Sequence, residues 1–368
     1  MRQRKFSNHQ MGIAVDLGST TIAVCCIDMT TKEEILSFSF ANPQTAYGTD
    51  IMTRIKHCIT DKNKLILFRD IVLQELYKQL QDRLNEYISN IVQIVYSGNT
   101  TMLHILRGFD VKSLSEAPFV PVDISYYEEP SCLFNNAKDV FLSGFSAFVG
   151  ADILSGAVYL NIGNKLSYDL LIDLGTNGEI LLLNQNQGYA TSTACGPVFD
   201  HAIKGAKYGS ETIHAISNCL KNGLIDSFGT IQNPYFEKGL QIDKEFIIKQ
   251  EHIRNFQLAK GAIFAGIQTI ILEAGISIDE IEHVYLSGGF GFYMQIRDAF
   301  TVKLLPNALK NKIRISGNTS LEGAKLFLLC DNRELYLKQS NSMIERTKSI
   351  ELANSHYFNE QYIQAMNF

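Results

Sequence analysis

The chain has 368 residues, of which 46% are hydrophobic and 19% charged, and its formal net charge is −5. This apolar content, with 26 Gly and only 7 Pro, excludes the disordered, collagen-like and low-complexity classes. The length predicts two or three domains, or two large lobes. The charge gives no sign of a nucleic-acid binder, which would carry a basic stripe, but it leaves small anionic ligands open, because backbone amides can bind phosphate.

The cysteines are scattered along the chain and odd in number. They are Cys25, Cys26, Cys58, Cys132, Cys195, Cys219 and Cys330. No pair has the C-x-x-C spacing of zinc sites and ferredoxin-type clusters, so we expect reduced thiols, no iron–sulfur cluster and a cytoplasmic location. The basic start is not followed by the apolar core of a signal peptide, and no run of about 18 apolar residues predicts a membrane span.

The first strong pattern, at residues 12–28, is an apolar run, an Asp-Leu-Gly-Ser-Thr-Thr turn and a second apolar run, which predicts two strands joined tightly. Gly18 lets the chain turn sharply and lets an anion approach the backbone amides. The hydroxyl donors that follow are Ser19, Thr20 and Thr21. Asp16, at the strand end, is a candidate for holding Mg²⁺ through water, because hard cations prefer carboxylate oxygens. Taken singly, such a turn is more typical of an ordinary β-hairpin.

The next elements alternate between helix and strand. Residues 67–90 place apolar side chains at spacings of three and four, which predicts an amphipathic helix. Residues 94–98 (IVYSG) predict a buried strand that ends in Ser-Gly. After a loop-rich stretch at 112–131, the sequence FLSG at 141–144 precedes a helical segment rich in small residues at 148–160.

The second half of the chain repeats this order. Residues 169–184 contain the turn Asp173-Leu-Gly-Thr-Asn-Gly, residues 284–288 read VYLSG, and RISG at 314–317 precedes a helical segment at 319–330. The turn residues that repeat the first anion-binding pattern are Gly175, Thr176 and Asn177. Three similar elements in register indicate two halves built on one plan, each a sheet with packed helices, and hence an α/β fold.

The remaining segments complete the expected architecture. Residues 257–274 predict a long helix that Gly275 ends, 221–250 are loop-rich, and 340–368 predict a linker, a short strand and a final helix. At 286–291 (LSGGFG), a glycine pair after a strand would let a flat ring such as adenine lie on the backbone, unless this is a glycine-rich loop without a ligand. The candidates there are Gly288, Gly289 and Phe290.

The segments GIAVDLGSTT, LIDLGTNGEI and LSGGFG, in this order, resemble the phosphate-1, phosphate-2 and adenosine motifs of the acetate and sugar kinase/Hsp70/actin (ASKHA) superfamily. The resemblance implies an actin-like, ribonuclease H-like ATPase fold with two similar lobes around a nucleotide cleft. The helices at 148–160 and 319–330 fall where the superfamily has its connecting helices. The domain organisation that we expect is a tail at 1–11, a first lobe at 12–147, the first connecting helix and second lobe at 148–316, and the second connecting helix and C-terminal segment at 317–368.

Several further blocks resemble the ATPase part of the RACo-like reductive activators of corrinoid proteins. They are residues 42–55, 98–108, 117–122, 141–160 and 192–202, together with the C-terminal pattern. The resemblance implies that ATP binding and hydrolysis are coupled to the reduction of a corrinoid protein from inactive Co(II) to Co(I). Family activators usually carry a fused iron–sulfur module, whereas this sequence begins its ATPase motif at residue 12. We therefore expect a separate ferredoxin-like protein to supply the electrons. The resemblance allows a homodimer without requiring one, and it implies no nucleic-acid or membrane partner.

The superfamily's chemistry implies roles for particular residues. Asp16 and Asp173 would organise Mg²⁺ and the attacking water at the ATP phosphates, and the three turns would bind the nucleotide. Asp152 would orient water or act as a base, although a carboxylate at a helix N-terminus is also favoured by the helix dipole alone. The work would be positioning and charge stabilisation. Two other functions remain open, namely a small-molecule kinase of the same superfamily and a non-catalytic nucleotide switch or chaperone for a metalloprotein.

Three other features could have a structural role rather than a functional one. Cys195 lies in a small-residue loop and is more typical of an inert buried thiol than of a cluster ligand. His104, among apolar neighbours, is more typical of a packed histidine than of a metal ligand. Asp200 and His201 depart from the RACo-like pattern, so the contacts of that segment are open.

Overall fold

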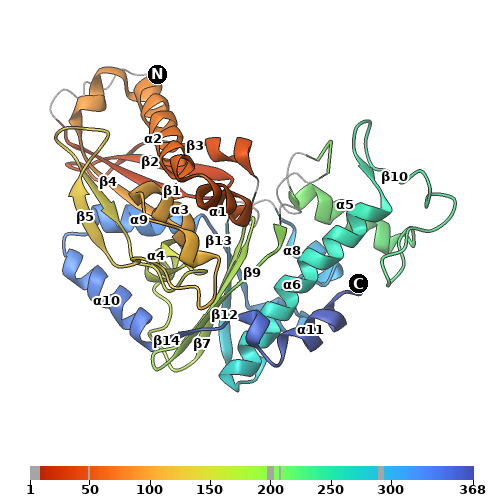
Figure 1. The fold of residues 1–368 in the computed structure, drawn as a ribbon. Coiled ribbons are helices and arrows are strands. Elements are labelled where there is room, and N and C mark those ends of the chain that lie inside the picture. The colour runs from red at the N-terminus through yellow and green to blue at the C-terminus, as the bar shows by residue number, and fades with distance from the viewer. Residues whose placement is uncertain (1–8, 49, 197–202, 207–208, 289–293) are drawn as a thin grey trace. The chain divides into compact units, whose positions relative to one another are not determined.

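The computed structural model describes residues 9–48, 50–196, 203–206, 209–288 and 294–368, and it divides into two compact units (Figure 1). Unit 1 comprises the chain up to Asn161 together with Thr319–Glu345. Unit 2 comprises Ile162–Asn318 and Arg346–Phe368. Each unit is built on a six-stranded sheet. None of the helices in the described ranges is both long and apolar enough to span a bilayer.

The sheet of unit 1 has the strand order β3-β2-β1-β4-β6-β5. Its strands are β1 (Met11–Leu17), β2 (Thr21–Asp28), β3 (Glu34–Ala41), β4 (Ile91–Gly98), β5 (Tyr127–Pro130) and β6 (Lys138–Phe141). The first three strands form an antiparallel meander, and β4 and β6 run parallel to β1. The strand β1 is buried on both faces, as its near-continuous apolar sequence predicts for a central strand of a covered sheet.

The sheet of unit 2 repeats this plan, with the order β13-β12-β7-β8-β9-β14. Its strands are β7 (Tyr168–Leu174), β8 (Gly178–Leu183), β9 (Gly188–Thr193), β12 (Ile281–Ser287), β13 (Ile313–Gly317) and β14 (Thr347–Ser349). Strands β7, β8 and β9 form the antiparallel meander, and β12 and β13 continue in parallel from β7. The predicted duplication is therefore confirmed strand for strand, with one additional edge strand in each sheet, β5 in unit 1 and β14 in unit 2.

The helices of unit 1 cover its sheet. They are α1 (Ile51–Thr60), α2 (Lys62–Leu84), α3 (Thr100–Arg107), α4 (Ala151–Tyr159), α9 (Thr319–Leu329) and α10 (Arg333–Arg346), of which α10 ends at the boundary with unit 2. The amphipathic helix expected at 67–90 is confirmed as α2, although it begins five residues earlier, after the N-cap Asp61, and gives way to a 3₁₀ segment at Asn85. Its buried residues are Phe68, Val72, Leu73, Leu76, Leu80 and Leu84.

The helices of unit 2 are α5 (Gly209–Lys221), α6 (Gln250–Ala274), α8 (Ile296–Thr301) and α11 (Phe358–Ala365), and a small hairpin joins β10 (Leu240–Gln241) to β11 (Ile247–Ile248). Gly275 ends α6 in the left-handed conformation (φ 67°), as predicted. The last helix, α11, lies against α6 (Figure 1). Lys260 of α6 is fully buried and donates from Nζ to the carbonyl of Asn367 (2.6 Å). Burial lowers the pKa of this lysine to about 7.

One segment differs from its expected structure. Residues 340–346, expected to form a linker, are the last two turns of α10. The polar sequence SNS favoured a loop, but Met343 is buried and the hydroxyl of Ser340 donates to the carbonyl of Tyr336, one turn earlier. Packing in the folded chain overrides the weak local preference, because propensity is a small term beside burial.

Helices α4 and α9 cross at two glycines. A Cβ on Gly323 of α9 would fall on the backbone of Ser155, and a Cβ on Gly156 of α4 would lie 2.6 Å from Oγ1 of Thr319. The backbones therefore meet where neither residue has a side chain. This explains the small residues that marked both segments in the sequence.

This close approach predicts that Gly323→Ala destabilises the protein, despite the higher helix propensity of alanine. Overpacking of this kind costs about 1–3 kcal/mol, because the backbone must shift. The matched control is Gly261→Ala in α6, where the added methyl would meet a side-chain atom of Tyr362 at 3.4 Å, an ordinary contact. That variant should be neutral or up to about 1 kcal/mol more stable. Urea unfolding measures both changes, and equal effects in the two variants would contradict the close packing of α4 on α9.

Candidate functional site

The first candidate turn lies at the end of β1. Every residue of this strand is buried except Asp16, which is half-buried. A Cβ on Gly18 would lie 2.5 Å from the carbonyl oxygen of Thr21, so the tight turn between β1 and β2 requires a residue without a side chain here. Ser19 is buried within the turn, and Thr21 begins β2. The sequence thus placed the carboxylate, the glycine and the hydroxyl groups together correctly.

A chain of buried serines leads to Asp16. The hydroxyl of Ser320, on α9, donates to Oδ1 of Asp16 (2.7 Å). The same hydroxyl bonds to that of Ser97 at the end of β4 (2.9 Å), which also bonds to the hydroxyl of Ser155 on α4 (2.8 Å). Three segments far apart in sequence therefore connect the candidate carboxylate to the crossing of α4 and α9. Sequence reasoning missed Ser155 and Ser320, since nothing in their local pattern distinguishes them from other small helix residues.

The second candidate turn repeats the geometry of the first. In β7, too, every residue is buried except the aspartate, Asp173. The hydroxyl of Ser287, at the end of β12, donates to Oδ2 of Asp173 (2.5 Å). In the turn, the backbone amide of Gly175 donates to the carbonyl of Asn177 (3.0 Å), and Thr176 is buried.

Both turns lie beside a strand that ends in Ser-Gly. In the parallel pairs, Asp16 is in register with Ser97, and Asp173 with Ser287. The glycine that follows each serine also makes the same approach: a Cβ on Gly98 would lie 2.6 Å from the carbonyl oxygen of Leu17, and one on Gly288 would lie 2.6 Å from that of Leu174. Gly288 also has a left-handed φ of 92°. The other two candidates of the third motif, Gly289 and Phe290, lie outside the described residues.

Asp152 lies in the first turn of α4, where its Oδ1 accepts from the backbone amide of Ile153 (2.9 Å). This position suits a carboxylate electrostatically, because the helix N-terminus carries partial positive charge. The helix cap, Gly150, offers no side-chain oxygen. Both roles foreseen for Asp152, water orientation and dipole stabilisation, therefore remain predictions.

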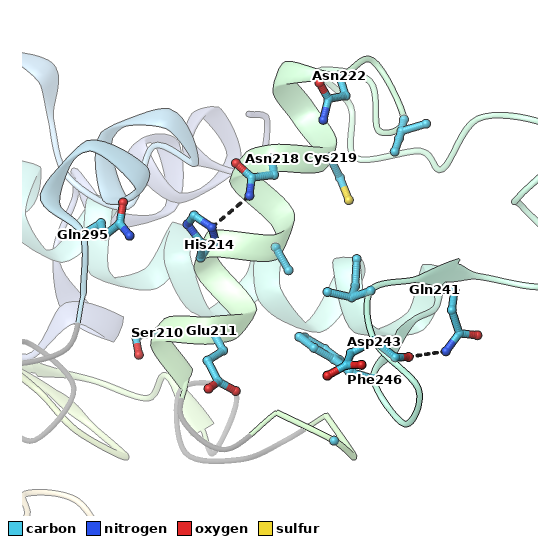
Figure 2. Close-up of a pocket in the computed structure, with 14 residues that line it drawn as sticks. Ser210, Glu211, His214, Asn218, Cys219, Asn222, Gln241, Asp243, Phe246 and Gln295 are labelled. Carbon is cyan, nitrogen blue, oxygen red and sulfur yellow. Dashed lines mark hydrogen bonds between the residues drawn. The ribbon is translucent and has the colours of Figure 1, made fainter.

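A pocket of about 710 Å³ in unit 2 was not foreseen from the sequence. Figure 2 shows side chains of α5 on one side and Gln241, Asp243 and Phe246, from the hairpin of β10 and β11, on the other. Its apolar lining includes Phe246, and its polar lining includes His214, Asn218 and Gln295, with a hydrogen bond between His214 and Asn218 (3.0 Å). A pocket of this size with a few convergent polar groups suits a drug-sized or nucleoside-sized ligand.

One wall of this pocket is fixed by a buried carboxylate. Asp298 of α8, only 1% exposed, accepts from Nδ1 of His214 (2.6 Å), Oγ of Ser217 (2.7 Å) and Nζ of Lys221 (3.0 Å). Burial alone would raise the pKa of Asp298, but these three hydrogen bonds outweigh it and hold the pKa below its usual value. The ionised aspartate thus ties α5 to α8.

Other residues singled out in the sequence have plain structural roles. His104 is buried, its Nδ1 bonds to the carbonyl of Thr100 (2.8 Å), and its Nε2 accepts from the amide of Val122 (3.0 Å), which confirms a packed histidine. Cys195 is buried. The segment with Asp200 and His201 lies outside the described residues. Within the described parts of the chain, no group of three or more His, Cys, Asp or Glu side chains is arranged to hold a metal ion.

Comparison with known protein families identifies two consecutive regions. Residues 11–165 match the RACo middle region, and residues 201–368 match the C-terminal domain of RACo, the ASKHA domain. The actin-like ASKHA fold expected from the three motifs is therefore confirmed, in agreement with the two duplicated sheets.

Individual proteins are also similar to this chain in sequence or in structure. The chain is 28% identical to the corrinoid activation enzyme RamQ of Eubacterium limosum, over 97% of this chain and 70% of that protein. It is 23% identical to the [Co(II) methylated amine-specific corrinoid protein] reductase of Methanosarcina barkeri, over 97% of this chain and 77% of that one. A solved structure of a reductive activator for corrinoid, iron–sulfur protein superposes with a TM-score of 0.89 at 26% identity, over 98% of this chain. This chain spans 66% of the length of that structure, just under two thirds.

The Asp298 cluster predicts a pH-dependent loss of stability. Because the pKa of Asp298 is lower in the folded chain than in the unfolded one, its contribution is present at neutral pH and is lost as the pH falls from about 4 through the folded value. Asp298→Asn should therefore cost roughly 2 kcal/mol at pH 7, where hydrogen bonds to an ionised group are lost, and progressively less below pH 4. Chemical unfolding at several pH values measures this difference.

The control for this experiment is Asp331→Asn. Asp331 also pairs with a lysine, Lys32 (2.7 Å), but its side chain is 88% exposed, and exposed pairs contribute little. A destabilisation by Asp298→Asn that stays constant from pH 7 to pH 3 would show that the charge of Asp298 is not what stabilises the wall of the pocket.

Proposed function

Because this chain belongs to the RACo family of ASKHA proteins, we propose that it is an ATPase that couples ATP to the reductive reactivation of a corrinoid protein from Co(II) to Co(I). The observation that carries the ATP part is the duplicated strand–turn–strand, in which a half-buried aspartate and a glycine-containing turn recur with a serine hydroxyl on the carboxylate. The similar proteins whose names specify corrinoid activation or reduction support the corrinoid part.

In this proposal the turns bind the phosphates of ATP. Backbone amides at 18–21 and 176–177 donate to phosphate oxygens, and the missing side chain of Gly18 lets the anion come close. Asp16 and Asp173 would hold Mg²⁺, mostly through water. A set of carboxylate and hydroxyl oxygens fits this hard cation, which neutralises charge on the phosphates when bound. The serine hydroxyls on Asp16 and Asp173 fix the direction of each carboxylate.

The nucleoside and the attacking water involve other groups. We assign the nucleoside to unit 2, which holds Gly288 and, as the candidate cavity, the pocket along α5. Gly289 and Phe290 stay candidates from the sequence alone. The amide groups of Asn218 and Gln295 are suited to a purine edge, and Phe246 offers an apolar surface. Asp152, at the start of α4, orients the attacking water or accepts its proton.

The redox half of the reaction lies with the partners. A Co(II) corrinoid protein is the substrate, and a separate ferredoxin-like iron–sulfur protein supplies the electron. The distribution of the cysteines supports a separate donor: they lie on separate elements, apart from Cys25 and Cys26, which are neighbours on β2 and point to opposite faces of the strand. Work from ATP is needed because the reduction to Co(I) is uphill for ordinary donors.

The carboxylates predict a loss of turnover in Asp16→Asn and Asp173→Asn. Each change removes a negative charge from the Mg²⁺ site while keeping the shape of the side chain, so ATP hydrolysis should fall on the order of a hundredfold. Release of inorganic phosphate measures this loss, with the exposed Asp279→Asn as the control. Unchanged hydrolysis in both site variants would exclude this site.

The corrinoid reaction predicts an ATP-dependent spectral change. Mixing a Co(II) corrinoid protein, a low-potential iron–sulfur donor, this protein and Mg·ATP should convert the Co(II) absorbance to that of Co(I), whereas omission of ATP or use of Asp173→Asn should not. A phosphate ester formed from a small hydroxyl compound would instead indicate a kinase. ATP binding without hydrolysis would indicate a nucleotide switch. No ATP-dependent change with any candidate corrinoid protein would exclude the activator.

A further inference from the structure

The segment at residues 42–55, which the proposed ATP chemistry does not use, begins with a residue that bonds to the backbone of the first candidate turn, residues 17–21. Asn42 is fully buried, and its backbone amide donates to the carbonyl of Thr20 (2.8 Å). Its side-chain Nδ2 donates to the carbonyl of Gly18 (2.9 Å). The backbone of the turn is therefore held from one side by a single asparagine, which immediately follows β3.

Behind this asparagine lies a fully buried arginine. Arg54 of α1 has 0% exposure, and its guanidinium donates from Nε to the carbonyl of Gly48 (3.0 Å) and from Nη1 to Oε1 of Gln44 (3.2 Å). Its Nη2 is buried with no hydrogen-bond acceptor among the residues that the structure describes. Burial lowers the pKa of Arg54, only to about 10, so the side chain is charged at neutral pH.

The charge of this arginine is poorly compensated. Among the described residues, the guanidinium bonds only to uncharged groups, namely the carbonyl of Gly48, Oε1 of Gln44 and the sulfur of Met102. Asp50 raises the pKa of Arg54 from a distance, but it is the N-cap of α1, and both of its oxygens accept from Thr53, one from the amide (2.8 Å) and one from the hydroxyl (2.7 Å). A buried cation without a bonded anion is costly, so proteins rarely keep one without a use for its charge.

Two residues connect the guanidinium to the turn. The backbone amide of Gln44 donates to Oδ1 of Asn42 (3.0 Å), while its side-chain Oε1 accepts from Arg54, so Gln44 links Arg54 to Asn42 and, through it, to Gly18. The sulfur of Met102 accepts a hydrogen bond from Nη1 of Arg54 (3.4 Å) and another from Nδ2 of Asn42 (3.7 Å). The positive charge and the asparagine that holds the turn are therefore neighbours around a single sulfur atom.

We propose that Arg54 is a positioning residue for polyphosphate: through Gln44 and Asn42 it fixes the turn at 17–21, and its buried, poorly compensated charge makes that turn selective for anions. This inference rests on the proposed binding of ATP. It assigns the selectivity of the first turn partly to a residue that never touches the ligand. An electric field from a buried charge is weakly screened, so it acts at the turn where an exposed lysine would not.

The experiment compares a charged ligand with its uncharged counterpart. Mg·ATP and adenosine are titrated calorimetrically into the wild type, Arg54→Met, Arg54→Lys and Arg346→Met. Arg54→Met removes the charge but keeps an unbranched apolar side chain suited to a buried site. Arg54→Lys keeps the charge while losing the forked contacts when the titrations are run at about pH 6, because burial lowers the pKa of a lysine, as it does for Lys260 to about 7. Arg346→Met is the control for loss of a partly buried arginine that binds a backbone carbonyl, that of Gly163.

We expect Arg54→Met to weaken ATP about tenfold or more while changing adenosine less than about twofold, and Arg54→Lys to retain most of the ATP affinity. Equal weakening of both ligands, or no weakening of ATP, would overturn the role of the charge. If Arg54→Met does not fold, Arg54→Lys decides the question, since an ATP affinity as low as that of Asn42→Ala would show that contacts alone matter. Failure of the wild type to bind ATP would instead contradict the proposed function.

Discussion

The structure of both candidate turns depends on one interaction, a buried serine hydroxyl that donates to an aspartate at the end of a central strand. A carboxylate in that position is only half-buried, and a hydrogen bond to an ionised group stabilises it by roughly 1.5–3 kcal/mol while fixing its direction. The donor must reach the strand end, so the neighbouring parallel strand must stop beside it. That requirement explains why the parallel neighbours of β1 and β7 both finish in a serine followed by a glycine: the glycine lets the backbone pass the carbonyl of Leu17 in unit 1 and that of Leu174 in unit 2 without a clash.

The two units meet this requirement differently. In unit 2 the strand-end serine, Ser287, donates directly to Asp173. In unit 1 the strand-end serine, Ser97, bonds to Ser155 and Ser320, and Ser320 supplies the hydroxyl to Asp16. The carboxylate of unit 1 is therefore coupled to α4 and α9, whose glycines allow no adjustment in their spacing. The direction of Asp16 therefore depends on where the crossing of the two helices places the hydroxyls of Ser155 and Ser320.

Much of this architecture was predictable, because it follows from periodicity and from glycine. Apolar runs around an Asp-Leu-Gly turn and their repetition after about 160 residues predicted two sheets on one plan. The serine chain and the charge of Arg54 were not predictable, since they depend on contacts between segments that are distant in sequence. Ser320 has no local signature, and the motif around Arg54 resembled a family block without indicating that its cation would be buried. The helix at 340–346 was missed for the same reason: its polar residues favour a loop until Met343 is buried.

The series of hydrogen bonds from Arg54 and the series of serines end at different groups of the same turn. Asn42 holds the carbonyls of Gly18 and Thr20, which directs the backbone of the turn, while Ser320 holds the carboxylate that precedes it. Each contact consumes an acceptor of the turn, so the groups left to face a ligand are weighted toward amide donors. The positive charge of Arg54 near these donors and the negative charge of Asp16 beside them together favour a ligand in which an anion is bound to a cation. Metal-bound polyphosphate has this combination of charges, whereas a bare anion would meet the repulsion of Asp16 and a bare cation that of Arg54.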